Sequence, residues 1–266
     1  MSAPSHRISR IEAGEIRARL PQNIKRVPVF APALCRVRLG VKRIWLGERE
    51  MSAGPERLVL LPAGIEADIA NLPGPDGYLA DIVSLPPGLL NDFRLRHGPL
   101  LLQQRPGFEL CPRLEPRVES AWNALLDSLR ANDPPEMSAH HACGVLLALA
   151  LAGQIEPLLR PAAGGITERV RHLLLLDPAA SWSVDMAARR LNQGASTLRR
   201  HLAEEGSSFR GILESLRMGL ALQQVQNGER AIADIAVSSG YASASRFSAR
   251  FRQRYGLTPS ELRRTL

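Results

Sequence analysis

The chain has 266 residues, of which 45% are hydrophobic and 23% charged, and this composition excludes a disordered or fibrous protein. The net charge of +8 is uneven, because residues 166–266 carry 15 arginines against 9 acids, whereas residues 1–165 carry 19 lysines and arginines against 17 acids. A basic region favours a polyanionic partner such as nucleic acid, although an ordinary solvated surface would show the same excess.

The first 26 residues are polar and show no clear period, so we expect an N-terminal arm. They lack the apolar segment of a signal peptide, and the longest apolar run, 143–153, is well short of the roughly 20 residues of a membrane span. These features predict a cytoplasmic protein. Cys35, Cys111 and Cys143 are widely separated, without zinc-ligand or redox-motif spacing, which favours buried free thiols over redox sensing.

Residues 27–152 are expected to form one domain that begins with short strands. Cys35, Val37, Leu39 and Val41 alternate with arginines and a glycine, which is the period of a strand with one apolar face. Turn signals rich in glycine and proline recur at short intervals as far as residue 77. Many short strands with regular turns predict a small antiparallel barrel or sandwich.

After Pro116 the apolar period becomes helical. It predicts a helix over 117–131, which ends before an Asn-Asp-Pro-Pro stop, and a second helix over 136–151. These helices either cover the barrel or pair with another copy of the chain, and the sequence leaves both possibilities open. The Pro- and Gly-bearing stretch 153–165 predicts a linker, and residues 166–266 are expected to be helical throughout.

The C-terminal region repeats one pattern, in which a small alanine precedes a glycine-containing turn and an apolar i, i+4 pair. The alanine lets two helices approach closely, and the apolar pair anchors the second helix to the core. The pattern predicts two helix-turn-helix units. The first contains Ala188, Leu198 and Leu202, and the second contains Ala236, Phe247 and Phe251, at a spacing of 48 or 49 residues.

The opposite face of each second helix is polar and basic, as expected of a helix that enters a DNA groove. Arginine pairs with guanine or clamps phosphate, and small hydroxyl side chains allow close approach to base edges. The predicted DNA-binding residues are Ser196, Thr197, Arg199 and Arg200 in the first unit and Ala244, Ser245, Arg246, Ser248 and Arg250 in the second.

A helix is predicted between the two units, over 208–226, from one apolar stripe that ends at Asn227-Gly228. Its length of roughly 27–30 Å is close to one turn of DNA, about 34 Å. A single chain would therefore read two successive major grooves.

Residues 166–266 resemble the AraC/XylS family of bacterial transcription regulators. The resemblance is carried by VDMAARRL at 184–191, STLRRHLAEEG at 196–206, Arg217-Met218, IADIA at 232–236, Gly240-Tyr241, SRFSARF at 245–251 and GLTP at 256–259. It implies a double helix-turn-helix domain that binds promoter or operator DNA and activates transcription through contact with RNA polymerase.

Two positions depart from the family pattern. Gly194 replaces a frequent capping serine, a change that costs only a few tenths of a kcal/mol. The basic residue of the second recognition helix is displaced from position 249, an alanine here, to Arg250. One residue turns a helical side chain by about 100°, so we expect Arg250 to touch phosphate, and Arg199 and Arg200 to read bases better than Arg246 or Arg250.

Residues 27–152, particularly VRLGVKRIWLGEREMSAGPERLVLLPAG, resemble the cupin-like regulatory domain of the same family. That resemblance implies binding of a small-molecule or protein effector, at residues the sequence does not identify, or dimerisation through 117–131 and 136–151. Residues 27–95 contain no histidine, which argues against a metal-dependent cupin enzyme, and no cofactor is expected.

The predicted fold class is α+β with two domains: a small antiparallel cupin-like barrel plus two helices, followed by an all-α double helix-turn-helix domain. The predicted function is that of a non-enzymatic, sequence-specific DNA-binding transcription regulator, an activator by family analogy. The alternatives are a sensor or adaptor whose C-terminal helices bind protein, and a cupin-type enzyme. Neither explains why arginines recur on both exposed helix faces.

Overall fold

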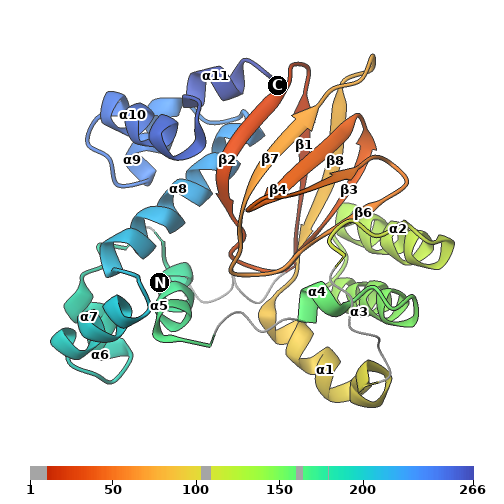
Figure 1. The fold of residues 1–266 in the computed structure, drawn as a ribbon, viewed down its shortest axis with the longest axis horizontal. Helices are drawn as coiled ribbons and strands as arrows, with labels where there is room; N and C mark the ends of the chain where they lie inside the picture. The colour runs from red at the N-terminus through yellow and green to blue at the C-terminus, as the bar shows by residue number, and fades with distance from the viewer. Residues whose placement is uncertain (1–10, 103–108, 160–163, 179) are drawn as a thin grey trace. The chain divides into compact units, whose positions relative to one another are not determined.

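The computed structural model describes residues 11–102, 109–159, 164–178 and 180–266 (Figure 1). The chain divides into two compact units. The N-terminal unit comprises residues 9–23 and 29–160, and the C-terminal unit comprises 161–266 together with the short segment 24–28.

The strands of the N-terminal region form two four-stranded sheets, of order β1-β8-β3-β6 and β2-β7-β4-β5. This arrangement agrees with the predicted antiparallel barrel or sandwich. A tight turn joins β3 to β4 at Gly40, where φ is +78° and a Cβ atom would lie 2.5 Å from the carbonyl oxygen of Leu72. The strands are β1 (Glu12–Ala18), β2 (Gln22–Pro28), β3 (Ala33–Leu39), β4 (Val41–Leu46), β5 (Arg49–Ala53), β6 (Leu58–Leu61), β7 (Glu66–Leu72) and β8 (Tyr78–Ser84).

The structure differs from the predicted arm over residues 1–26, because 12–18 and 22–28 are strands; residues 1–10 lie outside the described part. Strand β1 pairs with β8 from Glu12 opposite Ser84 to Ala18 opposite Tyr78. Most of its side chains are exposed, so its sequence shows no apolar alternation. Pairing with a strand 60 to 72 residues further along the chain, which local sequence does not reveal, holds it in place.

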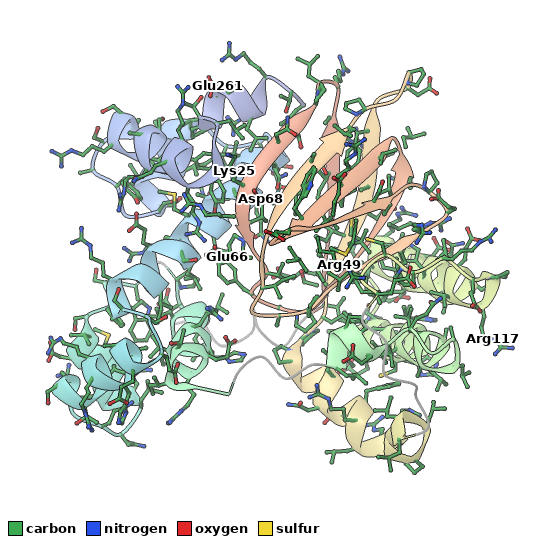
Figure 2. All side chains as sticks on the ribbon, viewed as in Figure 1. Lys25, Arg49, Glu66, Asp68, Arg117 and Glu261 are labelled. Atoms are coloured by element: carbon green, nitrogen blue, oxygen red, sulfur yellow. The ribbon has the colours of Figure 1, made fainter. Side chains whose placement is uncertain are left out.

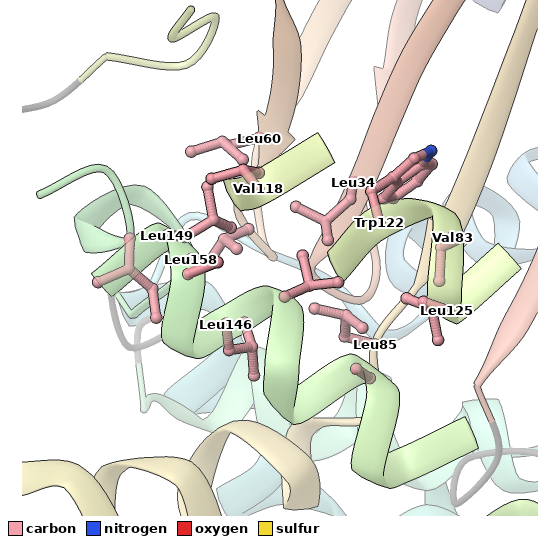
Figure 3. Close-up of a cluster of buried hydrophobic side chains, with 14 of the residues drawn as sticks. Leu34, Leu60, Val83, Leu85, Val118, Trp122, Leu125, Leu146, Leu149 and Leu158 are labelled. Carbon is pink, nitrogen blue, oxygen red and sulfur yellow. The ribbon is translucent and has the colours of Figure 1, made fainter. Parts of the chain in front are cut away.

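Helices cover the β1-β8-β3-β6 sheet. Leu34, Leu60 and Val83 of the sheet share one core with Trp122 of α2 and Leu146 of α3 (Figure 3). Alternate residues of the same strands, among them Cys35 and Val59, belong to a second core with β4 and β5. The predicted helices are α2 (Pro116–Arg130) and α3 (Pro135–Leu151), and their apolar stripes are buried within this chain.

Two further helices depart from the prediction. Helix α1 (Pro87–Leu102) was not predicted, and its signal is weak because Pro99 lies inside it and the backbone is non-helical at His97. Helix α4 (Glu156–Leu159) lies within the predicted linker 153–165, where Leu158 and Ile155 are buried in the core of the N-terminal unit. The predicted linker therefore contributes side chains to the core of the N-terminal unit in addition to connecting the two units.

The C-terminal unit is helical, and Figure 1 shows α6 and α7 near one end of the long helix α8, with α9 and α10 toward its other end. Ser208 caps α8 by accepting a hydrogen bond from the backbone N–H of Gly211, and the helix ends at Gly228 with φ +77°. The helices of the C-terminal unit are α5 (Ile166–Leu176), α6 (Val184–Arg190), α7 (Ala195–Glu204), α8 (Phe209–Asn227), α9 (Ile232–Ser238), α10 (Ala244–Tyr255) and α11 (Pro259–Arg263).

Two smaller expectations concern cysteines and membranes. Cys35 and Cys111 are buried free thiols, and Cys143 is a partly buried free thiol. Burial raises the pKa of Cys111 to about 11, so the unreactive thiol form prevails. Over the described residues, no helix has both the length and the apolarity to cross a membrane.

Candidate nucleic-acid interface

The first helix-turn-helix unit consists of α6 and α7. Ala188 of α6 and Leu198 and Leu202 of α7 are buried, as the repeated pattern of a small alanine and an apolar i, i+4 pair predicts. The opposite face of α7 is open, with Ser196, Arg199 and Arg200 exposed and Thr197 half-buried. The second helix of this unit therefore presents its predicted polar face to solvent.

The two arginines of α7 differ in their partners. A guanidinium nitrogen of Arg200 lies 3.9 Å from a carboxylate oxygen of Glu204, one turn later on the same helix. Within the described structure, the side chain of Arg199 makes no hydrogen bond or ion pair. An exposed pair of this kind contributes little to stability, so Arg200 can leave Glu204 for a ligand, and Arg199 has no such pair to break.

The second unit consists of α9 and α10. Its recognition helix is held by an aromatic row, in which the ring of Phe251 lies 5.6 Å from that of Phe247 and 4.7 Å from that of Tyr255. Ala236 of α9 is buried against this row. On the other face Ala244, Ser245 and Arg246 are exposed and Ser248 is half-buried.

Arg250 lies apart from those residues. Its guanidinium is 2.7 Å from one carboxylate oxygen of Glu214 on α8 and donates a hydrogen bond of 3.0 Å to the other. It also donates to the side-chain oxygen of Gln253 at 2.8 Å. A hydrogen bond between two charged groups is stronger than one between neutral groups. Arg250 therefore joins the second recognition helix to the helix between the two units.

Three residues that the site prediction did not include link elements of the C-terminal unit to one another. Glu205 accepts backbone hydrogen bonds from Ile166 at 2.7 Å and Thr167 at 2.9 Å, at the start of α5. Arg217 of α8 donates to the carbonyl oxygen of Ala180 at 3.0 Å, and Glu214 holds Arg250. Glu205 and Arg217 lie in motifs quoted above, whereas no motif marked Glu214, and all of these contacts join residues 36 to 39 positions apart.

Comparison with known proteins finds similar sequences and folds. A family model described as a helix-turn-helix domain matches residues 187–265. The urease operon transcriptional activator of Escherichia coli is 36% identical over 96 residues, which cover 36% of this chain and 32% of that protein. The ornithine utilization regulator of Pseudomonas aeruginosa is 35% identical over 99 residues, or 37% of this chain and 29% of that protein. The C-terminal region therefore contains a helix-turn-helix domain, and the chain is similar to transcription regulators.

The chain spans about a third of the length of the relatives that it matches at highest identity. A longer match is the virulence regulon transcriptional activator VirF of Yersinia enterocolitica, 28% identical over 196 residues, which cover 69% of this chain and 71% of VirF. The crystal structure of ToxT from Vibrio cholerae has the same fold, with a TM-score of 0.69 at 15% identity over 97% of this chain and 99% of ToxT.

The N-terminal unit contains a buried polar group that sequence reasoning missed. Lys42, only 3% exposed, donates a hydrogen bond of 2.6 Å to the side-chain oxygen of Asn71, which in turn donates to Gln22 at 2.7 Å. The ammonium also lies 5.5 Å from the centre of the Tyr78 ring. Burial lowers the pKa of Lys42. In the described part of the chain, no group of three or more His, Cys, Asp or Glu residues is arranged to hold a metal ion.

Proposed function

We propose that this chain is a sequence-specific DNA-binding transcription regulator. The observation that carries the proposal is the pair of helix-turn-helix units, each with exposed arginine on its second helix, joined by the single 19-residue helix α8. Such a helix spans roughly 28 Å at 1.5 Å per residue, close to the distance between successive major grooves on one side of a duplex. Arg199, Arg200 and Arg246 would then face DNA.

The named relatives include activators of the urease operon and of a virulence regulon, which supports activation as the direction of regulation. An activator works by recruiting or reorienting RNA polymerase, so we propose polymerase as a second partner. Both partners place the protein in the cytoplasm.

A gel-shift experiment with the chain's own upstream region tests DNA binding. We expect a specific complex whose affinity falls steeply with salt concentration, because arginines displace counterions from phosphates. An Arg199→Ala, Arg200→Ala double variant should lose most of the specific complex, and Arg169→Ala, an exposed arginine on α5, serves as a control. Salt-independent binding, or no binding at any fragment of the upstream region, would exclude this function.

The N-terminal unit is proposed to bind an anionic small-molecule effector at Lys42. Burying an ammonium among amide and aromatic groups is unfavourable unless the amine loses its proton or an anion pairs with it. ToxT has been crystallised with an unsaturated fatty acid and with (E)-4-(8-methylnaphthalen-1-yl)but-3-enoic acid, both carboxylic acids. A carboxylate paired with Lys42 would supply the missing charge.

Thermal shift with a panel of carboxylic acids tests the effector site. Stabilisation of the wild type should be lost in Lys42→Met and kept in Arg43→Gln, the neighbouring exposed residue of β4. A panel that stabilises both variants equally would remove Lys42 from the effector site. Deletion to residues 166–266 addresses the rival, a protein effector, since constitutive activity would reveal inhibition by the N-terminal unit.

Dimerisation through α2 and α3 is a further proposal. Their buried stripes face the sheet, but Met137 and Leu151 at the two ends of α3 are 46% and 53% exposed. Analytical ultracentrifugation should show a dimer that Leu151→Glu weakens, and a monomeric wild type at all accessible concentrations would refute it.

A further inference from the structure

A recess of about 310 Å³ lies in the C-terminal unit between α8, the turn before α10, and α10 itself. Three arginines line it, Arg210 and Arg217 from α8 and Arg250 from the second recognition helix, together with Glu214 and Tyr241. Three guanidinium groups against one carboxylate leave the recess with an excess of two positive charges.

The existing contacts do not neutralise this excess. Glu214 is engaged by Arg250, and Tyr241 donates a weak hydrogen bond of 3.5 Å to the same carboxylate. Arg217 is fixed by backbone carbonyls, and Gly240 leaves it room, because a Cβ atom there would lie 2.7 Å from a guanidinium nitrogen. The wall of the recess is thus rigid while its charge is uncompensated.

Arg210 supplies an independent indication of an anion. It is the second residue of α8, in a first turn that contains no acidic residue, and its exposed side chain makes no hydrogen bond or ion pair with any described residue. The N-terminal end of a helix carries partial positive charge, so an arginine there is unfavourable on electrostatic grounds. An anion held at this end would interact favourably with both the helix and the guanidinium.

We propose that this recess binds a phosphate group, held by Arg210 and Arg250 and by the N-terminal end of α8. The favoured source is a backbone phosphate of the DNA between the two half-sites, because α8 joins the two recognition helices and Arg250 belongs to one of them. This inference rests on the proposed DNA binding. It assigns affinity, and not base preference, to the recess, since phosphate contacts carry no sequence information.

The test couples one protein residue to one phosphate. The full chain is bound to its footprinted operator, and single phosphates between the half-sites are replaced by neutral methylphosphonates. We expect one replacement to weaken wild-type binding about tenfold and to have no effect on Arg210→Gln, which is itself weaker by a similar factor and has a salt slope smaller by about 0.9. Arg252→Gln, an exposed arginine of α10 outside the recess, should stay sensitive to that phosphate.

A calorimetric titration with inorganic phosphate, without DNA, distinguishes the other source. Phosphate binding that Arg210→Gln abolishes, with no coupling to any DNA phosphate, would assign the recess to a free phosphate-bearing molecule. Specific operator binding with neither DNA coupling nor phosphate binding would overturn the inference and leave the proposed function intact. Arg210→Gln removes an unfavourable charge from a helix start, so a folding defect is not expected to obscure the result.

Discussion

The two helix-turn-helix units repeat one spacing but are stabilised in opposite ways. In the first unit the hydroxyl of Ser183 caps the leading helix α6, whereas recognition helix α7 starts at Gly194 with no side-chain cap. In the second unit α9 starts at Ala231 with no side-chain cap, whereas Ser243 caps recognition helix α10. The side-chain cap is therefore on the first helix in the first unit and on the recognition helix in the second unit.

The two recognition helices also differ in the side chains that anchor them and in the partners of their arginines. Leu198 and Leu202 anchor α7, whereas a row of aromatic rings anchors α10, and Arg250 is held by Glu214 while Arg199 is unpaired within the described structure. A repeated motif therefore does not imply repeated roles. We infer that the first unit carries more of the base reading and the second more of the rigid positioning.

The largest expected effect comes from the aromatic row. Phe251→Ala removes a buried ring that contacts two others, and such a cavity costs about 3–5 kcal/mol, so α9 and α10 should lose their protection against hydrogen exchange while α6 and α7 keep theirs. Val237→Ala, at a side chain that is 71% exposed, is the control. Equal loss of protection in both units would show that they unfold as one and break the comparison.

The next effect separates base reading from positioning. Arg200→Ala should cost about 1–3 kcal/mol on the operator and relax base preference at one position, whereas Arg250→Ala should weaken operator and random DNA by the same factor. Fluorescence anisotropy with both duplexes measures the two changes. Glu214→Gln keeps the size of that side chain and removes its charge, so it should leave base preference unchanged. A specificity change at Arg250 would assign base reading to both units.

Exchanging the caps gives a smaller effect. Ser243→Ala removes the hydroxyl that accepts the backbone N–H of Arg246, and loss of such a cap costs about 1 kcal/mol. Gly194→Ser places a hydroxyl at the start of α7 and should stabilise it by a few tenths of a kcal/mol. Amide exchange in the first turns of α7 and α10 reports each change locally. If Gly194→Ser instead lowers DNA affinity, close approach of the backbone at that position matters more than capping.

The sequence was sufficient to predict features set by local periodicity. The helices α2 and α3, the long helix α8 and both apolar i, i+4 pairs follow from spacing of residues a few positions apart. It was insufficient where partners are distant, as for β1, whose pairing with β8 spans 60 to 72 residues, and for Glu214, which meets Arg250 across 36. The burial of Lys42 was not predicted for the same reason, because its hydrogen-bond partner Asn71 lies on another strand.

The smallest expected effect is a loss of amide protection at acid pH. It concerns two carboxylates that accept hydrogen bonds from backbone N–H groups. Glu205 follows α7 and accepts backbone hydrogen bonds from Thr167 and Ile166, which lower its pKa below the ordinary value of 4.5. Glu261, labelled in Figure 2, has a lowered pKa for a local reason, the capping box that it forms with Thr258. The hydrogen bonds of Glu205 join residues nearly 40 positions apart, whereas those of Glu261 join residues three positions apart.

A carboxylate whose pKa is lower in the folded state contributes stability above its unfolded pKa, and that contribution is lost as the pH falls through the folded pKa. Below about pH 4, amide protection should therefore fall in the first turn of α5 for the wild type. Glu205→Gln should show this loss already at pH 7 and little further change, whereas Glu261→Gln should affect only α11. If acid pH loosens α10 before α5, the second unit is the less firmly held one, and the contrast between the two units must be reversed.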